Sequence, residues 1–291
     1  MQSAIEKAGV LLEALPYIQR FRERFVVIKL GGSVMDDRET MAAVLTDVAF
    51  MEQVGMWPVV VHGGGPRISA RMKEAGFEPT FVDGRRVTDA VTLEIAQKVL
   101  IDEISAEIVE HLAAAGGHGI ALNGRGSDFL HATKRLAGGH DLGFVGEVSR
   151  VEREIASRAS HGGLIPVVAP IARGEDGNLY NVNADSAAAR IASEIGAEKL
   201  VFLSNVPGVL ERPGDDGSLL STLRAEAAGE LVQRGVVAGG MQPKVEAGLE
   251  ALRAGVHTIH IVAAALRHAL LLEIFTDTGV GTQILAEGAD A

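Results

Sequence analysis

The sequence predicts an α/β fold, a three-layer αβα sandwich with a central, mainly parallel sheet and two lobes. Short runs rich in Val, Ile and Leu recur along the chain without polar alternation, as is typical of parallel strands covered on both faces. Helix-length segments separate these runs, and repeated strand–helix units indicate right-handed crossovers. The chain has 291 residues and a hydrophobic content of 47%, which is enough apolar material for one large or two medium domains.

The expected strands are residues 26–30, 58–61, 119–122, 165–169, 200–203 and 258–262. The expected helices are residues 38–54, 66–75, 90–115, 184–195, 225–234 and 243–254. Two segments interrupt this alternation. Asp176-Gly177, between the apolar pairs at 167–168 and 179–180, signals a hairpin, and the polar, Pro/Gly-rich segment 212–218 indicates a loop. We place the boundary between the lobes near residue 195.

The first 20 residues differ from the rest of the chain. They predict a helix with an apolar stripe, made of Ile5, Ala8, Leu11, Leu12, Leu15 and Ile18. A helix outside the sheet must bury such a stripe, because exposed apolar surface is unfavourable in water. The stripe can pack on its own domain or against another subunit, and the sequence leaves both open.

Composition restricts the class of protein. The formal net charge of −11 disfavours general binding to nucleic acid or anionic membranes. Cysteine is absent, so there is no disulfide framework, thiolate metal site or cysteine nucleophile. No apolar run approaches the roughly 20 residues of a membrane helix, and the N-terminus lacks the order of a signal peptide. We expect a soluble, cytoplasmic protein.

Two glycine-rich loops follow the first two expected strands. Lys29 ends the first strand and precedes Gly31 and Gly32, and His62 precedes three consecutive glycines and Pro66. Glycines at the carboxyl ends of parallel strands let backbone N–H groups approach a ligand's phosphate oxygens. A tight turn with a solvated lysine is the simpler interpretation of the first loop. His-Gly-Gly-Gly also occurs in esterases, but the Gly-x-Ser-x-Gly elbow they need is absent, as are the Walker A and Gly-x-Gly-x-x-Gly patterns.

Two further segments open helices. Asn183 and Asp185 begin one, where a cap and a favourable first-turn charge would be a sufficient structural explanation. Lys244 lies in the first turns of another, after Gly239-Gly240, where its charge opposes the helix dipole. Two lysines, a carboxylate to hold them and two glycine loops would suit phosphoryl transfer. A carboxylate acceptor needs no general base because it is already ionised at neutral pH.

Six ordered motifs carry a resemblance to a known family: IKLGGS, VVVHGGGP, GRRVTD, YNVNAD, FLSNVPGVL and GGMQPKVEAG. Their spacing resembles the amino acid kinase superfamily, and within it the acetylglutamate kinases, over nearly the whole chain. The resemblance implies ATP-dependent phosphorylation of the γ-carboxylate of N-acetyl-L-glutamate, giving N-acetylglutamyl 5-phosphate, the second step of arginine biosynthesis. It implies ATP as the phosphoryl donor. Because the sequence shows no carboxylate cluster for a dedicated metal site, we expect Mg²⁺ to bind through the ATP phosphates.

The resemblance also implies roles for individual residues. The implied catalytic residues are Lys29, Lys244 and Asp185. The implied phosphate-binding residues are Gly31, Gly32 and Gly64, and the implied acceptor-binding residues are Gly64, Gly65, Arg86 and Asn181. The implied nucleotide-binding residues are Ser204, Asn205, Val206, Gly208, Leu210, Gly239 and Met241.

Regulation and assembly follow from the same resemblance, to the arginine-sensitive members with an N-terminal helix. Residues 1–20 would be an oligomerisation helix, 21–195 a lobe for acceptor binding and dimerisation, and 196–291 a lobe for ATP and arginine. The implied arginine site consists of Tyr17, His268, Glu273 and Gly279. The expected assembly is a hexamer built from three dimers.

Three departures from the family pattern leave the acceptor open. They lie at 101–105, at 122–127 and at Asn205, where an aspartate is common. A kinase for another carboxylate, such as aspartate, glutamate or a carrier-linked aminoadipate, is the main alternative. A non-catalytic amino-acid sensor with the same fold is the alternative from a different class, and it is disfavoured by the presence of Lys29, Asp185 and Lys244.

Overall fold

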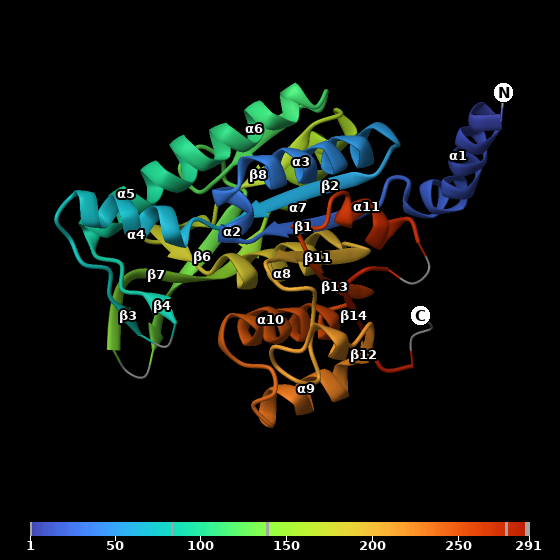
Figure 1. Cartoon of the computed structure of the whole chain (residues 1–291). Coiled ribbons are helices and arrows are strands. Elements are labelled where there is room, and N and C mark those ends of the chain that lie inside the picture. The colour runs from blue at the N-terminus through green and yellow to red at the C-terminus, as the bar shows by residue number, and fades with distance from the viewer. Residues whose placement is uncertain (1, 83, 138–139, 277–278, 289–291) are drawn as a thin grey trace.

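The computed structural model describes residues 2–82, 84–137, 140–276 and 279–288 and is built around an eight-stranded sheet (Figure 1). In spatial order its strands are β12 (Thr222–Arg224), β14 (Thr282–Leu285), β13 (Thr258–Ala263), β11 (Lys199–Ser204), β1 (Phe25–Leu30), β2 (Trp57–His62), β8 (Ile165–Val168) and β5 (Gly119–Leu122). Neighbouring strands are parallel except for the antiparallel pair β13 and β14. All six expected strands lie in this sheet, so the predicted fold class is confirmed.

Side chains alternate between two apolar cores. In β1, Val26 and Ile28 face one core, whereas Phe25 and Val27 face the other. A strand covered on both faces reads as a continuous apolar run because every position is buried, and all of β1 is buried.

Helices cover both faces of the sheet, as Figure 1 shows. One core includes side chains from α2 (Gly32–Asp36), α3 (Arg38–Gln53), α4 (Gly65–Glu74), α5 (Ala90–Gln97), η1 (Lys98–Ile104), α6 (Ser105–Ala114) and α11 (Ala269–Ile274). The other includes side chains from α7 (Arg153–His161), α8 (Ala184–Ile195), α9 (Ala225–Gln233) and α10 (Gln242–Arg253). The three layers are therefore helix, sheet and helix.

The expected helix at 90–115 contains a π-helix. η1 interrupts the α-helical pattern between α5 and α6. π-Helical turns are rare and occur frequently at functional sites. Nothing in the hydrophobic periodicity indicated this segment.

Several strands escaped the sequence analysis. They are β3 (Phe81–Val82), β4 (Arg85–Arg86), β6 (Leu130–Ala137), β7 (His140–Val151) and β9 (Ile171–Gly174), whereas β10 (Leu179–Val182) contains the pair 179–180 that was expected to flank the hairpin. A search for buried apolar runs passes over such strands because polar residues alternate along them. The hairpin at Asp176-Gly177 is present, but it joins β9 to β10. The partner expected at 167–168 was wrong, since those residues belong to β8 in the central sheet.

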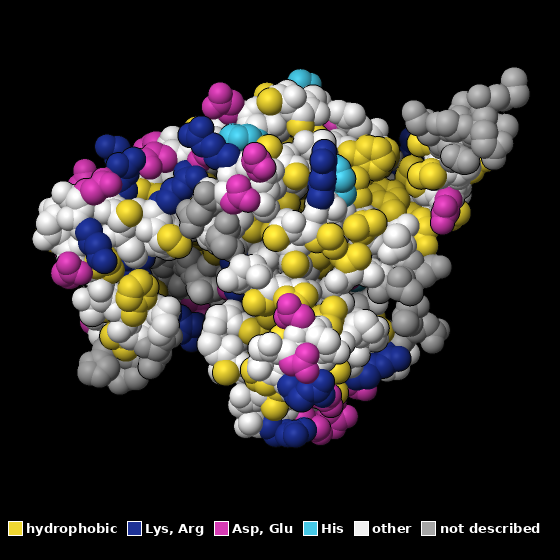
Figure 2. Space-filling view, viewed as in Figure 1, with side chains coloured by type: hydrophobic (Ala, Val, Ile, Leu, Met, Phe, Trp, Pro, Cys, Tyr) yellow, Lys and Arg dark blue, Asp and Glu magenta, His cyan; other side chains and the backbone are white. Residues whose placement is uncertain are grey.

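The N-terminal helix α1 (Gln2–Phe21) lies at the edge of the molecule. The relative exposures of Val10, Leu11 and Leu12 are 64%, 70% and 69%, and Figure 2 shows hydrophobic side chains at the surface of this region. Its C-terminal end packs on the body, through Phe21 in the core and Tyr17 against Phe275. The described apolar positions of the stripe before Tyr17 are therefore mostly not buried by their own chain, and the side chain of Ile5 lies outside the described residues.

The sheet is continuous across residue 195, because β11 pairs directly with β1. Both lobes therefore share one sheet. Among the described residues, no helix is long and apolar enough to cross a membrane.

Candidate active site

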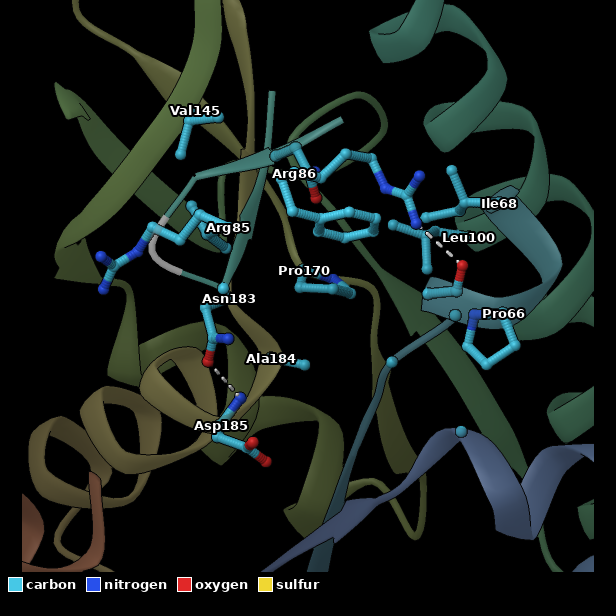
Figure 3. Close-up of a pocket in the computed structure, with 18 of the residues that line it drawn as sticks. Pro66, Ile68, Arg85, Arg86, Leu100, Val145, Pro170, Asn183, Ala184 and Asp185 are labelled. Carbon is cyan, nitrogen blue, oxygen red and sulfur yellow. Dashed lines mark hydrogen bonds between the residues drawn. The ribbon is translucent and has the colours of Figure 1, made fainter. Parts of the chain in front are cut away.

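Chain segments far apart in sequence converge at the carboxyl edge of the central strands. Lys29 on β1 pairs with Val61 on β2 and Phe202 on β11, so the loops after these strands are neighbours. A pocket of about 230 Å³ opens at this edge (Figure 3). It is lined by both glycine loops, by the start of α8 and by β4, as expected for an open parallel sheet.

Lys29, Asp185 and Lys244 form one charged cluster. The Lys29 Nζ atom lies 2.7 Å from one carboxylate oxygen of Asp185, and the Lys244 Nζ atom lies 3.6 Å from the other. Lys244 Nζ also donates a hydrogen bond to the Gly240 carbonyl at 3.0 Å. Burial lowers the pKa of Lys244 below its ordinary value, although Asp185 opposes this shift. The predicted catalytic residues are thus brought together.

The start of α8 explains how Asp185 becomes available. The Asn183 side chain caps the helix, accepting hydrogen bonds from the N–H groups of Asp185 at 2.9 Å and Ser186 at 3.0 Å. This cap confirms the structural interpretation of Asn183 (Figure 3). The Asp185 carboxylate is not used as a cap and contacts the two lysines instead.

The two glycine loops touch. A Cβ atom on Gly32, in the first loop, would lie 3.0 Å from the ring of Pro66, which follows the second loop. Gly64 is also closely packed, because a Cβ atom there would lie 2.6 Å from Leu100 Cδ2 of the π-helix. Gly32 and Gly64 line the pocket. Gly31 does not line it, and its N–H donates to the Leu203 carbonyl at 3.2 Å. The geometry therefore favours Gly32 and Gly64 over Gly31 as phosphate donors.

The predicted acceptor residues also line the pocket. Arg86 Nη2 donates to the Gly65 carbonyl at 2.9 Å and to Ser69 Oγ at 2.8 Å, and the guanidinium stacks on the Phe81 ring. Burial lowers the pKa of Arg86, yet an arginine remains protonated at all accessible pH values. Asn181 Nδ2 donates to Thr88 Oγ1 at 3.3 Å. A buried guanidinium and an amide that line one pocket are suited to binding a carboxylate.

A second, mainly apolar cavity of about 170 Å³ lies in the C-terminal lobe. Four predicted nucleotide residues line it: Val206, Gly208, Leu210 and Met241. Ser204, Asn205 and Gly239 do not line it. Val209 lies within the range 204–210 implicated by the resemblance, and the sequence analysis missed Pro213, Gly214, Val236, Val237 and Ala238, of which the pair 236–237 was visible as an apolar run before the glycines. The short helix η3 (Gly239–Met241) connects this cavity to α10 and Lys244.

A third cavity of about 470 Å³ lies between α1, α11 and β13. Tyr17, Glu273 and Gly279 line it as predicted, but His268 does not. His268 instead contacts the buried Asp47 on α3, with Nδ1 2.6 Å from Oδ1.

The sequence analysis missed the cationic side of this third cavity. Lys199 Nζ lies 3.0 Å from His260 Nε2, and His260 Nδ1 lies 2.6 Å from Glu273 Oε1. Burial lowers the pKa of Lys199 to about 8. The other oxygen of Glu273 accepts hydrogen bonds from the N–H groups of Val280 and Gly281. Burial by itself would raise the pKa of Glu273, but His260 and these two N–H groups lower it below its ordinary value. Acidic, basic and aromatic groups thus face one space.

The chain is similar in sequence to known kinases. A sequence model of the group described as "Amino acid kinase family" matches residues 24–263. The acetylglutamate kinase of Pelotomaculum thermopropionicum is 47% identical over 293 residues, covering 98% of this chain and 99% of that protein. The acetylglutamate kinase of Symbiobacterium thermophilum is also 47% identical, over 290 residues, with 98% and 99% coverage.

Solved structures give the same fold. An N-acetylglutamate synthase from Neisseria gonorrhoeae, complexed with coenzyme A and N-acetyl-glutamate, superposes with a TM-score of 0.87 at 26% identity. The superposition covers 97% of this chain and 64% of that synthase. A carbamate kinase from Giardia lamblia bound to AMP-PNP superposes with a TM-score of 0.64 at 15% identity, covering 91% and 99%, and supports the fold alone.

Proposed function

This chain belongs to the amino acid kinase family, and from this premise we propose that it phosphorylates the γ-carboxylate of N-acetyl-L-glutamate with ATP. The product is N-acetylglutamyl 5-phosphate, an intermediate of arginine biosynthesis. Relatives named acetylglutamate kinase, which match this chain over nearly their full length, support the activity. The observation that carries it is the Lys29–Asp185–Lys244 cluster beside a pocket that also holds Arg86.

In the proposed reaction, an oxygen of the acceptor carboxylate attacks the γ-phosphorus of ATP. The new P–O bond forms as the bond to the β–γ bridging oxygen breaks, and ADP leaves with the electron pair. No proton needs to move, because the acceptor is already ionised. Lys29 and Lys244 stabilise charge on the moving group, and Asp185 holds both ammonium groups in place.

The two substrates occupy different lobes in this proposal. Arg86 and Asn181 bind the α-carboxylate side of the acceptor, and Gly65 lies beside its acetyl group. The adenine occupies the apolar cavity at Val206 and Met241. The lobe before residue 195 therefore serves the acceptor, and the lobe after it serves ATP.

Magnesium is proposed to arrive with the nucleotide. Within the described part of the chain, no group of three His, Asp or Glu side chains could hold a metal ion. The described side chains therefore offer no set of ligands for a dedicated metal site. Mg²⁺ commonly binds through substrate phosphates instead. Calorimetry should detect Mg²⁺ binding only together with ATP, and tight binding to the free protein would contradict this proposal.

The departures from the family pattern bear on the choice of acceptor. Arg125 pairs with Asp102 at the surface, where their side chains are 46% and 48% exposed, and neither lines the pocket. These two departures therefore do not alter the acceptor site directly. Asn205 lines neither the acceptor pocket nor the apolar cavity.

The test is ADP release with a panel of carboxylates: N-acetyl-L-glutamate, L-glutamate, L-aspartate and 2-aminoadipate. N-acetylglutamate should give a kcat/KM at least about 100-fold above the others, since a missing acetyl group leaves its pocket unfilled and an added α-ammonium group meets Arg86. A higher value for free glutamate would transfer the assignment to that acceptor. No turnover with any of them would favour a sensor.

We also propose regulation and assembly. Arginine would bind in the third cavity, with its guanidinium on Glu273 and with Tyr17 over it. The exposed apolar residues of α1 would pack between dimers and build a hexamer. Arginine would then inhibit by favouring one setting of α1 and the ATP lobe. A reaction that consumes ATP for biosynthesis fits a cytoplasmic location.

A further inference from the structure

His62 is a fully buried histidine for which the proposed reaction has no use. It ends β2 and immediately precedes the glycine loop that carries Gly64. Its Nδ1 atom lies 3.0 Å from the Gly63 carbonyl, and its Nε2 atom lies 2.8 Å from Ser105 Oγ. Burial lowers the pKa of His62 to about 4, so the imidazole is neutral at physiological pH. A neutral buried imidazole whose two nitrogens both make hydrogen bonds links two segments in a fixed arrangement.

This link connects the glycine loop to the C-terminal end of the π-helix. Ser105 follows η1, its N–H donates to the Leu100 carbonyl, and its Oγ atom lies 3.0 Å from the same carbonyl oxygen. The same π-helix also packs against the glycine loop. A Cβ atom on Gly64 would lie 2.6 Å from Leu100 Cδ2 and 2.8 Å from Ile104 Cδ1. The π-helix therefore meets the loop through a hydrogen-bonded contact and through an apolar contact.

Consecutive glycines need such support. Glycine populates more backbone conformations than any other residue, so the loop by itself does not hold its N–H groups in one arrangement. Donors that stabilise a transferring phosphoryl group must be fixed before the reaction, because a misplacement of about 1 Å can cost on the order of 100-fold in rate.

We infer that His62 is a positioning residue that holds the Gly63–Gly64 segment of the glycine loop in its phosphate-binding arrangement by anchoring it, through Ser105, to the π-helix. This inference rests on the proposed function for its effect on rate. The anchoring itself is independent of which acceptor is phosphorylated.

The direction of the hydrogen bonds makes the inference specific. A neutral imidazole carries one N–H, and the Gly63 carbonyl can only accept, so the proton lies on Nδ1 and Nε2 accepts a hydrogen bond from the Ser105 hydroxyl. The side-chain amide oxygen of glutamine can accept at about the position of Nε2, whereas that of asparagine reaches only the position of Nδ1. His62→Gln should therefore keep the anchor, and His62→Asn should lose it.

The experiment compares His62→Gln, His62→Asn and Ser105→Ala with His111→Gln, a matched control on α6 that lies outside the pocket. His62→Asn and Ser105→Ala should lower kcat by about tenfold or more, with each KM within about threefold. His62→Gln and His111→Gln should stay within about threefold of the native kcat. The double variant His62→Asn/Ser105→Ala should be no slower than the slower single variant, because both changes remove one contact.

Hydrogen–deuterium exchange gives a readout that does not depend on turnover. The peptide spanning 59–66 should exchange at least about fivefold faster in His62→Asn and Ser105→Ala than in native protein, and at the native rate in His62→Gln. Equal losses in His62→Gln and His62→Asn, or native exchange and kcat in Ser105→Ala, would overturn the inference. If native protein phosphorylates no carboxylate, the proposed function fails, and the exchange rates still decide whether the anchor exists.

Discussion

Asp185→Asn tests the charged cluster directly, because it removes one charge and keeps the shape of the side chain. Asp185, Lys29 and Lys244 have side-chain exposures of 10%, 8% and 15%. With an effective dielectric constant of about 20, the N–O separations of 2.7 and 3.6 Å correspond to attractions of roughly 6 and 5 kcal/mol. Desolvation of the three ions offsets most of this energy. In the variant, two ammonium groups face each other without the carboxylate that holds them.

The expected consequences for binding and rate have opposite signs. Removing a negative charge beside the triphosphate should leave ATP binding unchanged or strengthen it. The transition state should lose about 3–4 kcal/mol of stabilisation, since the lysines no longer hold one arrangement, and kcat should fall about 100- to 1,000-fold. Breaking a buried ion pair also destabilises the fold by about 3–5 kcal/mol in typical cases, so Tm should fall as well.

The assay measures kcat from ADP release and the affinity for a non-hydrolysable ATP analogue by calorimetry. Asp176→Asn, on the exposed β9–β10 turn, serves as the matched control and should leave kcat unchanged. A folded Asp185→Asn protein with kcat within threefold of native would refute the role of the cluster. A loss confined to ATP affinity would refute the separation of binding from catalysis.

Three other predictions concern charge, recognition and regulation. Lys244→Arg should move the alkaline limb of kcat/KM to higher pH. Burial lowers the pKa of Lys244, so its charge is present below that pKa and is lost as pH rises through it, whereas arginine stays protonated. A pH–rate profile whose alkaline limb does not move would exclude Lys244 as the source of that limb. Arg86→Lys should weaken acceptor binding by about 10- to 100-fold and leave ATP binding unchanged, because lysine lacks the planar fork; calorimetry showing equal losses for both ligands would contradict the assignment. Deleting residues 1–20 should give a smaller, active, arginine-insensitive protein, and a truncated protein that keeps both its elution volume and its arginine response would disprove the role of α1.

Much of the fold follows from local sequence signals. The expected helix at 184–195 matches α8, because a side-chain cap at Asn183 and a left-handed Gly196 mark its two ends in the sequence itself. The central strands match because residues buried on both faces leave an unbroken apolar run. Strands β6 and β7 were missed because their polar and apolar residues alternate irregularly, and only their pairing with each other and with β9 and β10 makes them strands.

The sequence by itself determined which side chains meet in the candidate active site. Lys29, Gly64 and Asp185 each follow or end a recognisable strand or open a helix, and parallel strands place their carboxyl ends at one edge. Their meeting was therefore foreseeable from local patterns. Only the tertiary structure decided which groups touch. In the structure the Gly31 N–H donates to the Leu203 carbonyl. His268 contacts Asp47 and does not line the third cavity.

The tertiary structure also supplied the contacts that no local pattern encodes. Ser105 lies 43 residues from His62, and His260 lies 61 residues from Lys199. A hydrogen bond between such residues depends on the packing of whole elements, to which periodicity and turn chemistry are blind. The π-helix is the clearest case: its sequence has ordinary helical periodicity, and its position against Gly64 arises only when α5, α6 and the second glycine loop are packed together.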